Sequence, residues 1–203
     1  IKRTPASEYR LQGKGGKGNK SMSTKEEDNV NTVFTASTHD YVLFFTNMGR
    51  VYRRKGYQIP ASGKTAKGTN LVNILPIEPG ERVSAMISTT DISTGDRFLV
   101  MVTRSGTVKR LPGESLKNLR SNGIRALTLD EGDELISVRE TDGSMKILIA
   151  THDGSAVCFD ESDIRPTGRG SMGVRGIRLR EGDYVVGAAR AVPGKNVLTI
   201  TEL

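Results

Sequence analysis

The 203-residue sequence contains a single cysteine, no tryptophan and two histidines. One cysteine, Cys158, excludes an internal disulfide framework and a zinc site built from several cysteines. No apolar run approaches the roughly 18 residues that a membrane-spanning helix needs, and the longest run, residues 41–45, has the length of a strand. Residues 1–5 lack both an apolar signal-peptide core and an initiator methionine. We therefore expect a water-soluble, intracellular chain that is a fragment of a longer protein.

Positive charge is concentrated in the first third of the sequence. The chain carries 30 Lys and Arg against 23 Asp and Glu, a net charge of +7. Residues 1–68 hold 13 basic and 5 acidic residues, a balance of +8, and residues 69–203 hold 17 and 18, a balance of −1. A one-sided basic surface is typical of proteins that bind a polyanion, most often nucleic acid.

An internal repeat runs through the chain. Three segments share an apolar run, then Thr-x-x-Gly, then a second apolar or basic run: residues 42–51, 99–108 and 147–156. Each segment predicts two strands joined by a tight turn whose glycine takes a positive φ. A glycine followed by an acid, before another apolar strand, recurs at Gly80, Gly132 and Gly182, with spacings of 52 and 50 residues.

A period of about 50 residues with four short strands per unit is typical of a propeller-like ring of antiparallel blades. The sequence thus predicts an all-β fold, a single domain over residues 1–203 with about four blades. The expected units are a partial blade at 1–40, blades at 41–94, 95–143 and 144–194, and the first strand of a further or closing blade at 195–203.

The most unusual local segment is rich in glycine and lysine. It comprises Gln12, Gly13, Lys14, Gly15, Gly16, Lys17 and Gly18. Glycines let backbone N–H groups approach a phosphate, and the lysines supply charge. Residues 62–68 repeat the pattern 50 residues later, with weaker copies at 120–123 and 168–171. The segment at 63–65 is not a nucleotide-binding P-loop, because Gln58 stands where that motif needs a glycine.

The basic residues of the first two units and of the later loops are expected to form a rim that contacts DNA phosphates. They are Lys20, Arg50, Arg53, Arg54, Lys55, Lys64, Lys67, Arg120, Arg125, Arg169, Arg175 and Arg178. Roughly eight such contacts would give a slope of about −7 for log K against log salt. Residues 50–55 also fit a solvated edge strand that charge protects from aggregation. Without a basic surface that also carries aromatic side chains, single-stranded or base-specific binding is disfavoured.

Residues 12–18 resemble the seven-residue box of the DNA gyrase A C-terminal domain, Gln-basic-basic-Gly-Gly-basic-Gly, except that Gly13 replaces a basic residue. Residues 7–10, 25–28, 38–40, 49–52 and 173–179 are also similar to that family. The resemblance implies a β-pinwheel, usually of six blades, in which blades exchange strands and DNA bends around the outer rim.

The same resemblance implies that the chain is part of an ATP-dependent type IIA topoisomerase but carries no catalytic residue itself. The wrapped DNA would allow the holoenzyme to introduce negative supercoils. ATP and Mg²⁺ would bind elsewhere, leaving no cofactor or metal in this part. The implied partners are double-stranded DNA, the N-terminal part of gyrase A and the gyrase B protein in an A2B2 assembly, without a membrane. The isolated chain would be a monomer from the nucleoid-associated bacterial cytoplasm.

Other interpretations remain open at this stage. The equivalent domain of topoisomerase IV lacks an intact box. A protein-interaction propeller would bind an acidic partner through an apolar or aromatic rim, and a propeller enzyme would need polar residues converging on its channel. His39 and His152 are expected in turns, Cys158 in the core, and Asp133 and Asp183 as turn residues at strand entries.

Overall fold

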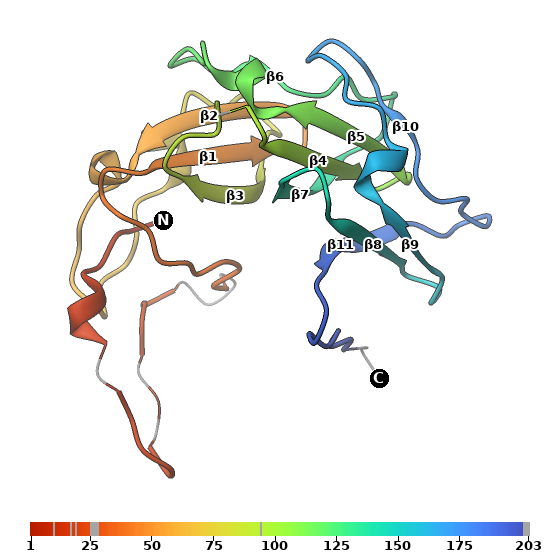
Figure 1. Ribbon diagram of the computed structural model, residues 1–203. Helices are drawn as coiled ribbons and strands as arrows, with labels where there is room; N and C mark the ends of the chain where they lie inside the picture. The colour runs from red at the N-terminus through yellow and green to blue at the C-terminus, as the bar shows by residue number, and fades with distance from the viewer. Residues whose placement is uncertain (10, 17, 19, 25–28, 94, 201–203) are drawn as a thin grey trace.

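A computed structural model describes residues 1–9, 11–16, 18, 20–24, 29–93 and 95–200. These residues form three antiparallel sheets that lie side by side along an arc (Figure 1). The strands are β1 (Tyr41–Thr46), β2 (Arg50–Lys55), β3 (Val83–Thr89), β4 (Phe98–Thr103), β5 (Thr107–Pro112), β6 (Ile124–Arg125), β7 (Leu135–Thr141), β8 (Lys146–Thr151), β9 (Ala156–Asp160), β10 (Val174–Arg175) and β11 (Val185–Ala191). Five short 3-10 helices connect them: η1 (Ala6–Glu8), η2 (Gly56–Gln58), η3 (Leu71–Asn73), η4 (Gly113–Leu116) and η5 (Glu161–Asp163).

Each sheet is built on a tight hairpin, as the Thr-x-x-Gly pattern predicts. The hairpins β1–β2, β4–β5 and β8–β9 turn at Gly49, Gly106 and Gly154, whose φ angles are 73°, 87° and 83°. Gly49 is also required by packing, because a Cβ there would lie 2.5 Å from the carbonyl oxygen of Leu127. The following repeat therefore closes directly over the turn.

The fourth strand of a sheet comes from the next repeat. The strand orders are β3-β1-β2-β6, β7-β4-β5-β10 and β11-β8-β9. The two-residue strands β6 and β10 each leave their own repeat and pair with the outer strand of the preceding one, β2 and β5. In Figure 1, β6 and β10 lie on the outer side of the arc, and β3, β7 and β11 lie on the inner side. The all-β prediction with four-stranded antiparallel sheets is confirmed, but a sequence repeat and a sheet are not the same unit.

The apolar strands of the first two sheets are buried on both faces, because other parts of the chain cover each face. In β4, Leu99 and Met101 belong to the core shared with the first sheet, and Val100 and Val102 belong to the core shared with the third. The far face of the first sheet is covered by residues 59–77, through Ile59 and Leu75, and by Ile1. A continuous apolar run is what a strand buried on both faces requires.

Hydrogen bonds between repeats hold the sheets in register. Leu135 N donates to Asn47 O at 3.0 Å, and Val185 N donates to Arg104 O at 2.9 Å. Asn47 and Arg104 occupy the same position in successive hairpin turns, directly after the threonine. The turn of each of the first two hairpins is therefore hydrogen-bonded to the first residue of the inner edge strand of the following sheet, β7 or β11.

Two expectations at the ends of the chain differ from the structure. Residues 196–200 form no strand, and residues 201–203 of the expected closing unit lie outside the described part. A strand needs a hydrogen-bonding neighbour, and no described strand pairs with 196–200. The described residues of 1–40 form one isolated parallel bridge, Arg3 to Ala61, rather than strands of a blade.

The expectation that Cys158 lies in the core is wrong, since its side chain is exposed. Val157 and Phe159 pack on the core between the second and third sheets, so the alternation of the strand turns Cys158 to the opposite face. No further sheet of the described residues covers that face. Among the described residues, no helix has the length and apolarity to cross a membrane.

Candidate nucleic-acid interface

The glycine-lysine segment forms a closed loop that Gln12 holds together. Gln12 Oε1 accepts a hydrogen bond from Gly18 N at 3.0 Å, and Gln12 Nε2 donates to Gly18 O at 3.3 Å. Gly16 N donates to Gly13 O at 3.2 Å, which forms a turn inside the loop. The glutamine side chain thus forms a clasp that binds both backbone polar groups of Gly18.

The glycines of this loop have distinct reasons to be there. A Cβ on Gly16 would lie 2.6 Å from Gln12 Oε1, so a side chain would break the clasp. Gly15 and Gly18 have φ angles of 84° and 74°, the left-handed region that favours glycine. Lys14 is exposed, and Lys17 lies outside the described residues. The sequence motif therefore corresponds to one compact loop that presents Lys14 to solvent.

The stretch of chain that carries this loop rests on the second basic loop, residues 62–68. Lys64 Nζ donates to Glu8 O at 3.3 Å and lies 5.0 Å from the ring centroid of Tyr9. On the returning side, Ser23 Oγ donates to Thr65 O at 2.7 Å. The structure thus brings together two basic loops that the sequence places 50 residues apart.

Lys2 holds the second basic loop through its backbone carbonyls. The ammonium of Lys2 donates to three backbone oxygens, Gly63 O at 2.8 Å, Lys64 O at 2.7 Å and Ala66 O at 3.1 Å. These carbonyls therefore point toward Lys2, while the side chain of Lys67 is exposed. Backbone carbonyls that bind an ammonium are the opposite of a phosphate-binding P-loop, whose N–H groups face the ligand.

Lys109 holds the basic loop at 168–171 in the same way. It lies on β5, is 1% exposed, and donates to Ala126 O at 2.9 Å, Arg169 O at 3.0 Å and Ser171 O at 2.8 Å. Burial lowers the pKa of Lys109 to about 8, since desolvation disfavours the charged ammonium. The three accepting oxygens favour the protonated form, which is present at neutral pH.

Three arginines of β2 hold the third basic loop, residues 119–123. Arg53 donates to Leu119 O at 3.2 Å, Arg54 to Ser121 O at 3.4 Å, and Arg50 to Asn122 O at 3.0 Å. The sequence predicts these arginines on the DNA-contacting rim. The structure places their guanidinium groups against backbone carbonyls of the neighbouring repeat.

All three arginines have further partners within the fold, and so does Lys55; Arg54, for example, donates from Nε and Nη2 to Ile74 O at 3.1 and 2.8 Å. Arg50 forms an ion pair with Glu78, and Arg53 lies 4.7 Å over the ring of Tyr41. Lys55 Nζ lies 3.4 Å from the centroid of the same ring and donates to His39 O at 2.9 Å. The basic run 50–55 is therefore mostly engaged in structural contacts.

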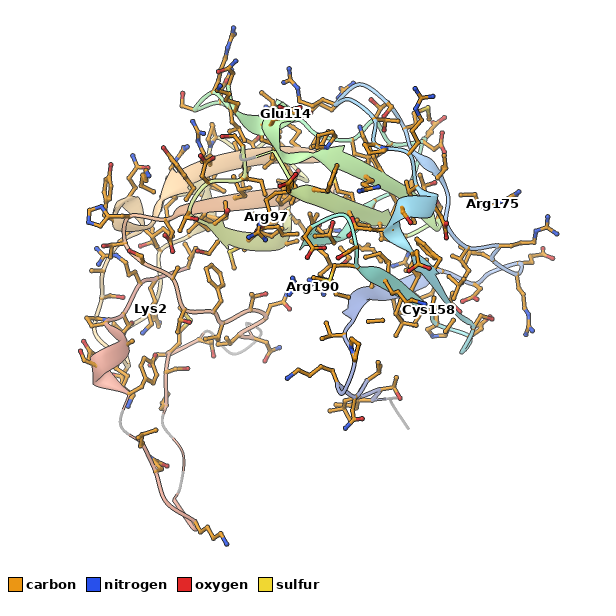
Figure 2. The ribbon with its side chains drawn as sticks, in the orientation of Figure 1. Lys2, Arg97, Glu114, Cys158, Arg175 and Arg190 are labelled. Carbon is orange, nitrogen blue, oxygen red and sulfur yellow. The ribbon has the colours of Figure 1, made fainter. Side chains whose placement is uncertain are left out.

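The remaining predicted cations are exposed, and none of them forms an ion pair with a described residue. They are Lys14, Lys20, Lys67, Arg120, Arg125, Arg169, Arg175 and Arg178. Arg125 and Arg175 lie on β6 and β10, the exchanged strands at the outer side of the first two sheets. Figure 2 shows Arg175 at the outer margin of the molecule, away from Arg97 and Arg190 near β7 and β11. The outer side thus carries positive charge that is open to a ligand.

The sequence interpretation did not include the anchoring lysines, Lys2 and Lys109, or two exposed cations beside the basic loops. Lys117 and Arg165 are exposed beside the third and fourth basic loops but lie just outside the repeated pattern. Lys2 and Lys109 had a signal, since residues 1–5 and 108–112 match each other in the repeat. The match aligns Lys2 with Lys109, but the neighbouring residues in the sequence do not indicate that both side chains face inward.

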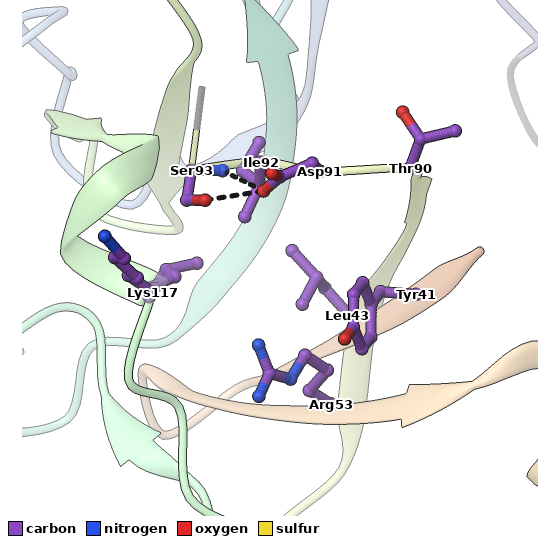
Figure 3. A pocket seen from close by; sticks show the side chains of 9 residues that line it. Tyr41, Leu43, Arg53, Thr90, Asp91, Ile92, Ser93 and Lys117 are labelled. Carbon is purple, nitrogen blue, oxygen red and sulfur yellow. Dashed lines mark hydrogen bonds between the residues drawn. The ribbon is translucent and has the colours of Figure 1, made fainter. Parts of the chain in front are cut away.

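An open pocket of about 240 Å³ lies between the first two sheets (Figure 3). Its lining includes Tyr41, Arg53, Asp91, Ser93 and Lys117. Asp91 Oδ1 accepts from Ser93 N at 2.8 Å and from Ser93 Oγ at 2.6 Å, which holds the pKa of Asp91 below its usual value. Arg53 and Asp91 are thus already used in structural contacts, and the geometry assigns the pocket no chemistry.

The acids at strand entries act as turn residues, as expected. Asp133 Oδ1 accepts from Ser105 N at 2.9 Å, and Asp183 Oδ1 accepts from Asp153 N at 3.0 Å. Each carboxylate therefore binds the hairpin turn of its own sheet. His152 stacks on Tyr184 with ring centroids 4.8 Å apart and contacts the Asp153 carboxylate. The described part of the chain contains no group of three or more potential metal ligands.

Repeated antiparallel sheets, two of which take their fourth strand from the next repeat, define a propeller-like domain. The family model described as DNA gyrase C-terminal domain, beta-propeller, matches residues 1–37, 40–90, 97–142 and 146–191. The chain belongs to this family.

Similar proteins agree with that assignment. The DNA gyrase A protein of Staphylococcus aureus strain MRSA252 is 48% identical over 204 aligned residues, which cover 100% of this chain and 23% of that protein. The chain therefore spans about a quarter of the length of the curated relatives it matches. A solved DNA gyrase A C-terminal domain has a TM-score of 0.74 at 30% identity, covering 93% of this chain and 60% of that one. The C-terminal domain of DNA topoisomerase IV has a TM-score of 0.75 at 29% identity, covering 85% and 53%. The fold is thus common to both enzymes.

Proposed function

We propose that this chain binds double-stranded DNA without sequence preference and bends it around its outer side. We further propose that this wrapping lets a gyrase holoenzyme of A and B proteins introduce negative supercoils with ATP. The catalytic tyrosine, the ATP and the Mg²⁺ would belong to other parts of that assembly, in the nucleoid of the bacterial cytoplasm. The chain's own contribution is a curved, positively charged surface.

The observation that carries this proposal is the grouping of exposed cations on the exchanged strands and the basic loops. Arg125 on β6 and Arg175 on β10 repeat at the same place on neighbouring sheets. Arg120 and Arg169 lie in the loops just before these strands. Cations that recur from sheet to sheet along an arc match the repeating phosphates of a bent duplex.

The energetics favour many weak contacts over a single strong site. Smooth bending of a duplex over tens of base pairs costs on the order of several kcal/mol. Release of counterions by each phosphate contact offsets that cost and makes binding salt-dependent. Since the basic run of β2 is engaged with carbonyls, we expect these contacts to come from the loops and the exchanged strands instead.

The membership of the family adds support for the identity of the ligand. The relative at 48% identity is the A protein of a DNA gyrase, and Gln12 and Gly18 of the box close a complete loop here. A topoisomerase IV domain shares the fold, and a protein-interaction propeller would bind an acidic protein through an apolar rim. These alternatives become outcomes of the experiment.

The experiment measures whether the chain wraps relaxed plasmid DNA, read as a shift in topoisomers after nicking and ligation. We expect a shift with the wild-type chain and a smaller one when Arg120, Arg125 and Arg175 are all replaced by Gln. The matched control removes equal charge elsewhere, with Arg97, Arg190 and Lys195 replaced by Gln, and is expected to keep the shift. A wild-type chain that binds plasmid without moving the topoisomers would favour the topoisomerase IV interpretation. No binding at all would refute the proposal and leave an acidic protein as the partner.

A further inference from the structure

We infer that Lys2 and Lys109 are positioning residues for DNA: each holds a basic loop of the following repeat in the conformation that meets the phosphates. This inference rests on the proposed function and assigns the basic residues two different roles. One set faces outward and contacts DNA, and a second set faces inward and fixes the loops that carry the first.

The geometry of the lysine site explains why an ammonium stands there. Three backbone oxygens, of Ala126, Arg169 and Ser171, converge on Lys109 Nζ within 3.0 Å. An ammonium has three donors and no acceptor, so it satisfies all three oxygens at once. An apolar side chain of the same length would leave buried carbonyls without their donor, which is costly. The loop would then relax away from this position.

A basic side chain binds the backbone oxygens of three successive loops, a lysine at the first and third and arginines at the second, which argues against coincidence. Lys2 binds three oxygens of loop 62–68, and Lys109 binds two oxygens of loop 168–171. In the repeat between them, Tyr52 stands at the equivalent position of β2. There the loop carbonyls at 119–122 are bound by neighbouring arginines. The fold thus supplies a cation to every one of these loops, by two different side-chain solutions.

Burial separates this role from direct contact with DNA. Lys109 is 1% exposed, so its ammonium cannot reach a phosphate while the loop is in place. No ion pair joins Lys109 to a carboxylate in the part of the chain that the structure describes, and burial lowers its pKa.

The experiment compares Lys109→Met with Arg169→Met in the full chain. Affinity for a duplex is measured over a series of salt concentrations, and amide hydrogen exchange is measured without DNA. For Lys109→Met we expect roughly tenfold weaker binding, an unchanged salt slope, and faster exchange in residues 167–173. For Arg169→Met we expect unchanged exchange and a salt slope that is smaller by about 0.9, the loss of one phosphate contact.

Two controls keep the result interpretable. Leu111→Ala, on the same strand and buried in the core between the first two sheets, lowers stability without touching the loop and should leave exchange at 167–173 and DNA affinity unchanged. If Lys109→Met does not fold, Lys2→Met carries the test at loop 62–68, with the exposed Lys67→Met as its contact counterpart.

The inference is wrong if Lys109→Met has wild-type exchange and affinity. It is also wrong if Lys109→Met reduces the salt slope of DNA binding by about 0.9, the value for one phosphate contact. If the wild-type chain does not bind DNA, the proposed function fails. The exchange measurement still decides in that case whether these lysines hold the loops.

Discussion

Arg50 of β2 and Arg125 of β6 are direct cross-strand partners in the first sheet. Like charges opposite each other destabilise a strand pair unless one of them is neutralised. Here Arg50 pairs with Glu78 and donates to Asn122 O, while Arg125 is exposed and has no ion pair with a described residue. One arginine of the pair therefore serves the fold, and the other is available to a ligand.

Replacing these two arginines should give opposite results. Arg125→Ala is expected to leave the free energy of unfolding unchanged and to reduce the salt slope of DNA binding by about 0.9. Arg50→Ala should lower the free energy of unfolding by about 1 kcal/mol and leave the slope unchanged. Urea unfolding and salt titrations of both variants measure this. Equal slopes for the two variants would contradict the assignment.

Gln12→Ala should open the glycine-lysine loop without affecting the sheets. The clasp joins only Gln12 and Gly18 in an exposed loop, so the melting temperature should stay within error of the wild type. Trypsin should cleave faster after Lys14, and DNA affinity should fall because the loop is no longer preorganised. Limited proteolysis followed by mass spectrometry reports the cleavage. Protection of Lys14 at the wild-type level would show that the clasp does not hold the loop.

The lysines of the box should be needed for supercoiling in particular. With Lys14 and Lys17 both replaced by Ala in the complete gyrase, ATP-dependent supercoiling should stop while relaxation of supercoiled DNA continues, because only wrapping is lost. Gel assays of both reactions on the same preparation separate the two effects. Supercoiling at the wild-type rate would mean that the box has been assigned wrongly.

Removal of the buried Glu161 carboxylate should strongly destabilise the chain. Glu161 accepts from Thr141 Oγ1 at 2.6 Å and from Gly143 N at 2.9 Å, and lies 3.3 Å from Arg110 Nε. Glu161→Ala leaves the buried guanidinium of Arg110 without its carboxylate partner, a loss of about 3 kcal/mol. The neighbouring Asp160→Ala breaks only an exposed pair with Lys146 and should cost under about 1 kcal/mol. Chemical unfolding of both variants checks the contrast.

Lys109 should make stability rise with pH in an alkaline window. Its folded-state pKa of about 8 lies below the ordinary lysine value of 10.5, so between these values the unfolded chain binds more protons than the folded one. The free energy of unfolding should therefore increase from pH 8 to pH 10.5 through this group, by up to about 3 kcal/mol in all. That gain is absent once the pH falls below the folded-state pKa. Unfolding at several pH values, with Lys109→Met as the reference, isolates the effect, and identical pH profiles would exclude it.

Much of the local architecture could be predicted because it depends on neighbours in sequence. The turns at Gly49, Gly106 and Gly154 have the positive φ angles that the Thr-x-x-Gly pattern requires. The period of about 50 residues indicated antiparallel blades, and the glycines of residues 12–18 indicated a loop rather than a strand or helix. In each case the deciding interactions lie within a few residues.

The location of individual side chains could not be predicted in the same way. The pattern that placed Cys158 on an apolar strand could not show that β9 has one uncovered face. It also could not distinguish Arg50, which binds Glu78 and a loop carbonyl, from Arg125, which faces outward. Both outcomes depend on strands contributed by a repeat far away in the chain.

The all-β class, the repeat, the hairpin turns and the excess of positive charge in the first third follow from the sequence alone. The folded structure is needed to know which strand joins which sheet, and therefore which cations are buried beneath the loops and which are exposed above them. The physical reason is that turn conformation is set by local sterics and hydrogen bonds, whereas the burial of a charge is set by everything packed around it. Lys2, Lys109 and Lys14 are all lysines, but the fold directs the first two ammonium groups toward backbone carbonyls and leaves Lys14 exposed to solvent.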